Sequence, residues 1–359
     1  MGTATTPAEA FEPTTGLIYL DSASYGLPPR ATIAAMRHAL DAWQGGRADW
    51  IADWDRPADE TRTPFAALCG VAAADVALLP AVSVGVGMVA AALTARDEVV
   101  VPADEFTSVL FPLLVAAERG TAVREVPFAT LAEAVRPTTT LVAFSLVQMQ
   151  TGKRADLASI VERAHAVGAR VLVDITQALP FLRAGEDLAA ADYLVCAAYK
   201  HLLSPRGVAF MSISADAADT VSPLAANWRA ADQPYGRYFG GPLTLGSGAA
   251  RFDVSLAWLP WVGARESLRL IAEWQATGEL ARVPELASRL TRALGQPEPA
   301  STLVCVPVRD PDAVRAALAA AGIRASVRGT AIRLAPHVYT TDAAIDAAVE
   351  VLRPFVAPG

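Results

Sequence analysis

Cysteine, lysine and long apolar runs are all scarce in this sequence. Its three cysteines, Cys69, Cys196 and Cys305, are too few and too widely spaced for a disulfide framework or a CxxC metal site. No apolar run reaches the roughly 18 residues of a membrane-spanning helix. The first residues, MGTATTPAEAFEP, lack the basic and apolar segments of a signal peptide. Acidic residues outnumber basic ones by 37 to 30, so the basic stripe typical of nucleic-acid-binding proteins is missing. We therefore expect a cytoplasmic protein that binds a small molecule, without nucleic-acid or membrane partners.

The shortage of lysine is informative about chemistry. Only two lysines occur, Lys153 and Lys200, and the other residues counted among the 30 lysines and arginines are all arginines. An arginine cannot lose its proton to become an amine nucleophile, whereas a lysine can. If the chemistry needs such an amine, these two residues are the only candidates. Lys153, in the polar segment TGKR before a predicted helix, has the setting of a surface lysine.

Apolar β-branched runs alternate with alanine-rich helical stretches between residues 61 and 214. Strands are predicted at residues 75–79, 98–101, 141–147, 170–174, 193–196 and 208–213. Strands that are apolar throughout, separated by helices, are typical of a parallel sheet covered on both faces. Ligands of such sheets bind at the carboxyl ends of the strands.

The rest of the chain predicts a second, smaller unit. Residues 215–248 are rich in proline, glycine and aromatic residues and predict a long loop, followed by a helix over 255–280. The tail predicts a strand at 302–308, a helix at 311–321, a strand at 330–336 and a helix at 341–356. We predict two domains: residues 1–250, with an N-terminal segment and the large ligand-binding domain, and residues 251–359. The N-terminal segment 17–29 is expected to pack with the smaller unit.

Three polar residues lie where such a sheet would bind its ligand. Asp174 ends the apolar run in VLVDITQ, Lys200 follows the next run in DYLVCAAYKHLLSPRG, and Ser83 begins a helical stretch in LLPAVSVGVGMVAAAL. A buried carboxylate needs a partner, and a hydroxyl with free backbone N–H groups at a helix start can hold a phosphate. Each residue also has a purely structural interpretation. Asp174 can cap a helix, Lys200 can extend to the surface, and the small residues around Ser83 can serve helix packing.

A carboxylate, an amine and a phosphate-binding turn around one crevice are what pyridoxal phosphate requires. Its aldehyde condenses with a lysine, an acid keeps its ring nitrogen protonated, and its phosphate binds at a helix N-terminus. A dinucleotide site fits less well, because Gly85 and Gly87 lack the third glycine of the GxGxxG fingerprint. The four histidines show no metal-ligand spacing, so we expect no metal.

These motifs, in this order, resemble the class V aminotransferase family of fold-type I pyridoxal-phosphate enzymes. The resemblance runs from YLDSASYGLPP near the start to RLAPHVYTT near the end. The family includes cysteine desulfurases, kynureninases, isopenicillin N epimerase-like proteins and C–S lyases. The resemblance implies an α/β fold, with a large domain built on a mainly parallel seven-stranded sheet and a small C-terminal α+β domain. It also implies pyridoxal 5'-phosphate as cofactor, an amino-acid substrate, and a homodimer with shared active sites.

The resemblance further implies roles for individual residues. Lys200 resembles the Schiff-base lysine and Asp174 the partner of the pyridine nitrogen. The other implied cofactor contacts are Gln177 to the phenolic oxygen, Phe106 to the ring face, Ser83 and Tyr199 at the phosphate, and Ser255 at the phosphate of the neighbouring subunit. Val84, next to Ser83, is also predicted to contact the cofactor. Arg333 resembles a carboxylate-binding arginine, and we predict further substrate contacts at Tyr25, Gln148 and Tyr235. Arg333 can also be a strand-edge surface residue, and the aromatic loop around Tyr235 can be ordinary loop packing.

The sequence also departs from the family pattern. Ala197 stands where the family often has a phosphate-binding serine, and the loop IRASVRGTAIR has no cysteine where a desulfurase keeps its nucleophile. We interpret Cys305, in TLVCVPV, as a core residue. A cysteine desulfurase is therefore not expected. Family members with this layout and no loop cysteine often belong to specialised sulfur metabolism, so the resemblance implies an enzyme that acts on a cysteine S-conjugate, by C–S β-elimination or by decarboxylation-linked oxidative deamination. The alternatives are an aminotransferase or epimerase on another amino acid, and a non-catalytic or nicotinamide-binding protein.

Overall fold

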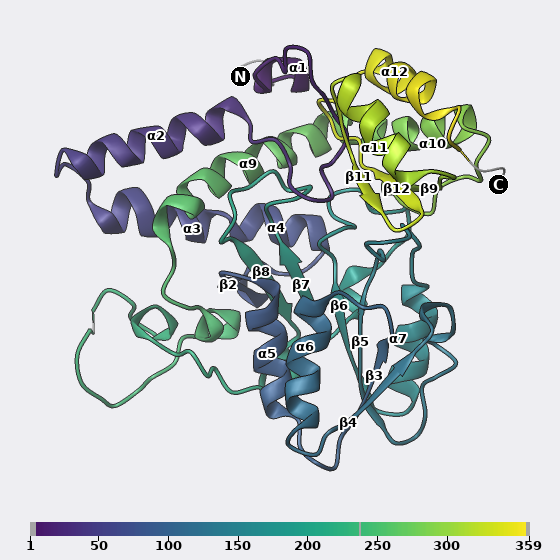
Figure 1. Ribbon diagram of the computed structural model, residues 1–359. Helices are drawn as coiled ribbons and strands as arrows, with labels where there is room; N and C mark the ends of the chain where they lie inside the picture. The colour runs from purple at the N-terminus through teal and green to yellow at the C-terminus, as the bar shows by residue number, and fades with distance from the viewer. Residues whose placement is uncertain (1–4, 237, 357–359) are drawn as a thin grey trace.

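The computed structural model describes residues 5–236 and 238–356. A seven-stranded sheet lies at its centre, in the order β2–β8–β7–β6–β5–β3–β4 (Figure 1). Its strands are β2 (Val76–Leu79), β3 (Glu98–Pro102), β4 (Ala122–Val126), β5 (Thr139–Ser145), β6 (Arg170–Asp174), β7 (Tyr193–Ala197) and β8 (Ala209–Ile213). Only β8 runs antiparallel to its neighbours β2 and β7, and the other adjacent strands are parallel. The predicted α/β fold with a mainly parallel sheet is therefore confirmed.

Both faces of the sheet are covered, which explains why its inner strands are apolar throughout. On β8, Phe210 stacks on Phe65 of helix α4 (Arg62–Cys69), with ring centres 4.2 Å apart. The next residue, Met211, points to the opposite face. There it packs beside Gly85 of helix α5 (Val82–Ala92), where an added Cβ would lie 3.3 Å from its sulfur. A strand buried on both sides cannot alternate apolar with polar residues.

The remaining long helices surround this sheet. Helix α6 (Thr107–Ala117) lies beside α5, α7 (Leu157–Ala166) packs on β5 and β6, and α9 (Trp258–Thr277) packs on α2 (Arg30–Gln44) (Figure 1). The short helices are α1 (Pro7–Ala10), η1 (Trp50–Asp55), η2 (Ala73–Asp75), α3 (Arg56–Glu60), η3 (Phe128–Thr130), η4 (Leu188–Ala190), α8 (Ala215–Ala218), η5 (Trp228–Ala230), η6 (Gly248–Phe252) and η7 (Glu279–Ala281). In the described part of the chain, no helix combines the length and apolar character needed to cross a membrane.

A smaller α+β unit follows α9. Its antiparallel sheet has the order β11–β12–β9, from β9 (Val304–Pro307), β11 (Ser326–Arg328) and β12 (Ala331–Leu334). Its helices are α10 (Arg282–Ala293), α11 (Pro311–Ala320) and α12 (Asp342–Leu352). Strand β1 (Ile18–Tyr19) pairs with β10 (Ile323–Arg324), and Leu20 joins the hydrophobic cluster of this unit, so the first part of the segment 17–29 packs here as predicted. The prediction is wrong for the rest of the segment, because Ala23 and Leu27 pack against the large unit.

Two large hydrophobic clusters underlie the two units. One gathers the sheet and its helices, including Trp261 and Trp274 of α9. The other gathers Leu20 with apolar residues between Leu286 and Leu352. The division of the chain at residue 250 stays a prediction.

An arm of mostly irregular chain connects α8 to η6, at the left of Figure 1. Asp55, which is fully buried, anchors it. Its carboxylate accepts hydrogen bonds from Arg229, from the Tyr235 hydroxyl at 2.7 Å and from Trp258 Nε1 at 3.0 Å. The described part of the predicted loop over residues 215–248 is thus an arm held by a buried carboxylate.

Candidate active site

A cavity opens at the carboxyl edge of the large sheet, where the predicted ligand site lies. It is lined by residues that follow β2, β3, β6 and β7 or precede β8: Pro80, Ala81, Val82, Phe106, Ser108, Asp174, Thr176, Ala197, Tyr199, Lys200, Arg206, Gly207 and Val208. The structure thus brings together four of the predicted site residues, namely Lys200, Asp174, Phe106 and Tyr199. They come from separate segments because adjacent parallel strands end at the same edge.

Lys200 is buried, with 5% of its surface exposed. Its Nζ lies 5.3 Å from the centre of the Phe106 ring and 5.8 Å from that of Tyr199. Within the described residues, no hydrogen-bond acceptor reaches this amine. Burial lowers the Lys200 pKa to about 8, Arg333 adds to this effect, and Asp174 opposes it. An amine in this setting is neutral at moderately alkaline pH and can act as a nucleophile.

Asp174 is the last residue of β6 and is also buried. Its Oδ1 accepts a hydrogen bond of 2.8 Å from the backbone N–H of Thr176, so the residue does shape the following turn. Burial nevertheless raises the pKa of this carboxyl, and the nearby Lys200 opposes that shift. A carboxylate at this position gains from a cationic group in the cavity.

Phe106 is held in place by its neighbour Glu105, which the sequence analysis missed. Glu105 is buried, and its carboxylate accepts hydrogen bonds from the Phe106 N–H at 2.6 Å and from the Ser145 N–H at 2.7 Å. The Ser145 hydroxyl donates a third, at 2.6 Å. Because Ser145 ends β5, this carboxylate ties the start of α6 to the sheet edge. The ring facing Lys200 is therefore fixed by a buried polar contact.

The N-terminal segment packs directly on the lysine loop. The Gly26 N–H donates to the Tyr199 carbonyl oxygen at 2.9 Å. A Cβ on Gly26 would lie 2.2 Å from the Lys200 carbonyl oxygen, so only glycine fits. The motif YGLPP thus carries a close backbone approach to the peptide at Lys200.

Other predicted cofactor residues do not line the cavity in this chain. Ser83 is exposed on the first turn of α5, and the N–H of Val84 is bonded to Ala81. Gln177 is buried, and its amide donates to the Ala23 carbonyl at 3.1 Å and contacts His201 Nε2 at 2.9 Å. Ser255 is exposed between η6 and α9. Their cofactor contacts stay predictions.

The predicted substrate residues divide into two groups. Arg333 is buried, with 1% of its surface exposed, and its guanidinium contacts Asp21 at 3.3 Å and the Ser24 hydroxyl at 2.8 Å. The charge of Arg333 adds to the lowering of the Lys200 pKa that burial causes, so this arginine lies in the same region. The strand-edge surface interpretation of Arg333 is wrong.

The other three predicted substrate residues have structural partners. The Gln148 amide donates to Asp104 and accepts from the Gln150 N–H at 2.7 Å. The Tyr235 hydroxyl donates a hydrogen bond to Asp55, and its ring packs against Trp50 and Trp228. Tyr25 is 42% exposed. Their contacts with substrate stay predictions.

Cys305 is not the core residue that its apolar strand suggests. It is only partly buried, whereas its neighbours Val304 and Val306 belong to the hydrophobic cluster of the small unit. In the antiparallel pairing of β9 with β12, Cys305 lies opposite Arg333. Side chains directly opposite share a face of the sheet, so the thiol points toward the arginine rather than into the cluster.

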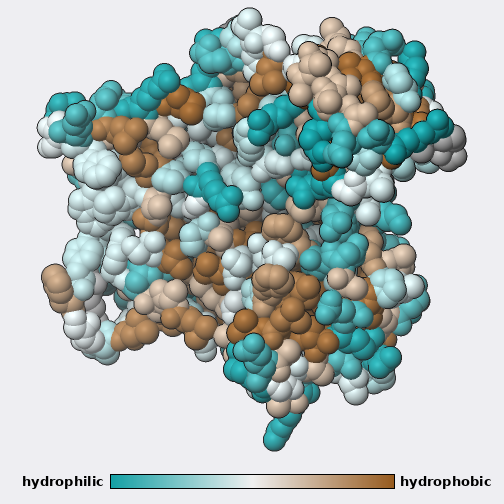
Figure 2. Space-filling model, in the orientation of Figure 1, coloured by the Kyte–Doolittle hydropathy of each residue, from teal (hydrophilic) through white to brown (hydrophobic). Residues whose placement is uncertain are grey.

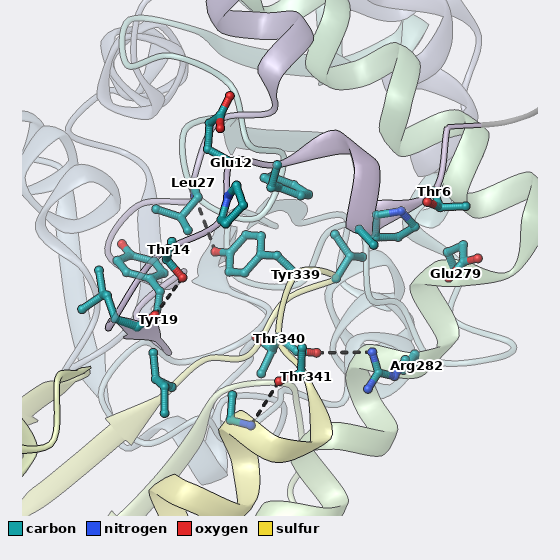
Figure 3. A pocket seen from close by; sticks show the side chains of 18 residues that line it. Thr6, Glu12, Thr14, Tyr19, Leu27, Glu279, Arg282, Tyr339, Thr340 and Thr341 are labelled. Atoms are coloured by element: carbon teal, nitrogen blue, oxygen red, sulfur yellow. Dashed lines mark hydrogen bonds between the residues drawn. The ribbon is translucent and has the colours of Figure 1, made fainter.

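A larger cavity, of about 640 Å³, lies between the N-terminal segment and the small unit (Figure 3). Figure 3 shows Tyr19, Leu27 and Tyr339 around it, and Arg282 bonded to the Thr340 carbonyl. Its polar groups are satisfied locally, since the Tyr339 hydroxyl lies 2.6 Å from that of Ser22 and Tyr19 donates to the Tyr25 carbonyl. No lysine, cysteine or histidine is among the described residues lining it. The smaller cavity around Lys200 is therefore the candidate active site.

Comparisons with known proteins identify the family of this chain. The family model for aminotransferase class-V matches residues 18–325. A probable cysteine desulfurase from Methanothermobacter thermautotrophicus is 28% identical over 58% of this chain, which spans only 55% of that protein. Isopenicillin N epimerase from Streptomyces clavuligerus is 27% identical over 82% of this chain and 83% of its own length.

A solved structure has the same fold. It is a complex between a cystine C–S lyase and its product cysteine persulfide, with a TM-score of 0.83, 22% identity, and coverage of 94% of this chain and 98% of that one. A variant of that lyase has glycine covalently linked to its pyridoxal phosphate cofactor.

Pyridoxal phosphate is the cofactor of the matched family, and the residues present fit it. Lys200 offers a buried amine without an acceptor in the described chain, Phe106 offers an aromatic face beside it, and Asp174 offers a buried carboxylate that lacks full compensation. The family match covers most of the chain, and the predicted resemblance is confirmed. This protein is a pyridoxal-phosphate-dependent member of the class V aminotransferase family.

Proposed function

We propose that this enzyme is a C–S lyase that acts on an S-substituted cysteine by β-elimination. Two features together carry the proposal. The buried Lys200 amine has no hydrogen-bond partner among the described residues, and the loop where a desulfurase keeps its nucleophile has no cysteine. The segment Ile323–Arg328 and the turn after it contain none. Without that nucleophile, sulfur leaves with its own substituent as a thiol rather than passing to the protein.

Each residue of the site has a role in this proposal. When bound, pyridoxal phosphate supplies an electron sink that weakens the bonds at the substrate Cα. Asp174 would hold the proton on the ring nitrogen of the bound cofactor, and Phe106 would cover one face of its ring. Lys200 Nζ takes the Cα proton, which its lowered pKa allows near neutral pH. The substrate then loses its thiol, and water releases pyruvate and ammonia.

Arg333 is proposed to bind the substrate carboxylate. Its guanidinium is oriented by Asp21, Ser24 and the Ser326 hydroxyl, the last at 3.3 Å. A planar guanidinium held in one orientation suits bidentate binding of a carboxylate. Its electrostatic influence on Lys200 supports a position beside the reacting centre.

A homodimer with shared active sites is part of the proposal. The arm and α6 expose large apolar residues, and Figure 2 shows apolar surface over α5 and α6 and along the arm. The most exposed are Phe239 at 92%, Leu224 and Leu243 at 65% each, and Phe111 at 56%. Ser255 is exposed as well and would reach the partner's cofactor. Sedimentation is expected to give a dimer, and an active monomer would contradict this part of the proposal.

The match to isopenicillin N epimerase favours a second candidate, an epimerase or aminotransferase on another amino acid. That match covers more of this chain than the match to the probable cysteine desulfurase does. A keto acid that retains the substrate side chain would indicate transamination. An inverted amino acid would indicate epimerisation.

The decisive experiment adds an S-alkyl cysteine to the purified enzyme and measures its visible spectrum and the released pyruvate. We expect a spectral shift with equal amounts of pyruvate and thiol. Carbon dioxide and aldehyde without pyruvate would replace elimination by decarboxylation-linked oxidative deamination. The variant Lys200→Arg should lose activity by at least about 1000-fold. The matched control Lys153→Arg, at the only other lysine, should keep it. Borohydride reduction should attach the cofactor to Lys200, and a label elsewhere would contradict the assignment.

A further inference from the structure

The strand order β2–β8–β7–β6 places Asp174 at one end of the cavity and the start of α5 at the other. Asp174 ends β6, whereas α5 begins just after β2, three positions away in the sheet. The entrance to β8 lies between them, because Ala209 pairs with Leu79 on one side and with Ala197 on the other. A cofactor whose ring nitrogen faces Asp174 therefore extends its phosphate toward the start of α5 and the residues just before β8.

Arg206 lies at that second end. It lines the cavity with Ala81, Val82 and Gly207, and it precedes β8 by only three residues. Its guanidinium carbon lies 5.2 Å from the centre of the Tyr199 ring. The side chain is otherwise exposed, and within residues 5–236 and 238–356 it has no ion-pair or hydrogen-bond partner. A cation is thus stacked on the wall of the cavity without an anion.

The phosphate end needs such a cation. The phosphate contacts implied by the resemblance, at Ser83, Tyr199 and Ser255, are all neutral groups. Ala197 has also replaced a hydroxyl that the family often supplies. A phosphate monoester carries nearly two negative charges at neutral pH, and the first N–H groups of a helix offset only part of them. Lys200 and Arg206 are the cationic residues among those that line the cavity, and Lys200 is required at the aldehyde.

We propose that Arg206 binds the phosphate of the cofactor, with the first turn of α5, and that it compensates for the serine replaced by Ala197. The planar guanidinium can donate two parallel hydrogen bonds to phosphate oxygens. Stacking on Tyr199 restricts the orientation of the guanidinium at the cavity wall. The inference rests on the cofactor alone and holds for any reaction that the enzyme performs with it.

The test compares binding of pyridoxal phosphate with binding of pyridoxal, which lacks the phosphate. Apo-enzyme is titrated with each compound, and binding is followed by visible absorption and tryptophan fluorescence, with no substrate present. Arg206→Gln is expected to weaken binding of pyridoxal phosphate by about tenfold or more and to change that of pyridoxal by less than about twofold. Arg206→Lys should lie between, because it keeps the charge but loses the paired donors.

Arg324→Gln is the matched control. Arg324 is also exposed and also stacked on a tyrosine, 5.7 Å from the Tyr25 ring centre, but it does not line this cavity. It should leave both affinities unchanged. Equal weakening of both compounds by Arg206→Gln would overturn the inference, because it would show that Arg206 acts only through packing on Tyr199. No effect on either compound would overturn it too.

Two controls distinguish a misfolded variant from a wrong cofactor assignment. Thermal unfolding of the apo-variants should match that of wild type, since Arg206 is exposed. If Arg206→Gln failed to fold, the comparison would be made with Arg206→Lys. If wild-type apo-enzyme bound neither compound, the cofactor assignment itself would fall together with this inference.

Discussion

Cys305 and Arg333 lie directly opposite each other on two antiparallel strands, β9 and β12. The thiol is therefore beside the arginine proposed to bind the substrate carboxylate. Burial raises the Cys305 pKa to about 11, and Arg333 and Arg328 oppose that shift only in part. The thiol is protonated at neutral pH and is a weak nucleophile there.

Replacing Cys305 by alanine should therefore leave elimination intact. We expect kcat/KM for pyruvate release to stay within about threefold of wild type, because no step uses a protein thiol. Cys305→Ser, which keeps the size of the side chain, serves as the control for packing. A loss of a hundredfold or more in both variants would show that sulfur passes through this cysteine and would contradict elimination without persulfide transfer.

Capture of the cofactor by apo-enzyme should depend on pH through Lys200. The folded-state pKa of this amine is lowered from 10.5 to about 8, so the neutral fraction rises as pH rises through 8. At low pyridoxal phosphate concentration, the association rate should increase with pH and level off above about 9. Stopped-flow absorbance measures this rate. A profile centred near 10.5 would contradict the lowered pKa.

Asp174 should matter for catalysis more than for folding. Burial raises the pKa of its carboxyl, so the charged form lowers the free energy of unfolding of the protein without cofactor. The substitution Asp174→Asn removes this destabilising charge. We expect the variant to bind cofactor, to unfold at wild-type temperature or above, and to lose about 100- to 1000-fold in kcat. Activity near that of wild type with cofactor bound would show that Asp174 does not face the ring nitrogen.

Glu105 should make stability depend on pH. Burial raises its pKa to about 7, so the folded protein keeps this proton while the unfolded chain loses it near 4.5. Folding stability should therefore fall as pH rises from about 4.5 to 7, by up to about 3 kcal/mol from this group. Urea unfolding of apo-enzyme measures the effect.

The pH dependence should weaken in Glu105→Gln, which has no proton to lose. Glu118→Gln, at the exposed end of α6, is the matched control and should keep the wild-type profile. An identical slope in Glu105→Gln and wild type would show that Glu105 does not titrate in this range.

The strands of the large sheet could be predicted because burial on both faces makes them apolar throughout. Strand β4 could not, because it lies at the sheet edge and its sequence AVREV carries two charged residues that are not buried. That Lys200 and Asp174 line one cavity could be predicted, because both follow neighbouring strands at the same sheet edge and lysine is scarce.

Glu105 and Arg206 escaped prediction for a different reason. In the sequence, DEF and SPRG have the composition of ordinary loops. Their roles depend on contacts with Ser145 and Tyr199 that only the fold creates. Gln177 is the opposite case, because the sequence predicts a cofactor contact for it. In the fold its amide is instead hydrogen-bonded to Ala23 and His201, and the sequence does not reveal these partners.

The glycine that touches the lysine loop also limits movement between the two units. Eight residues, from Tyr19 to Gly26, join the β1–β10 pairing to the hydrogen bond on the Tyr199 carbonyl. The small unit is thereby attached to the peptide that joins Tyr199 to Lys200. A displacement of the small unit at this point would have to break one of these two attachments or move that peptide.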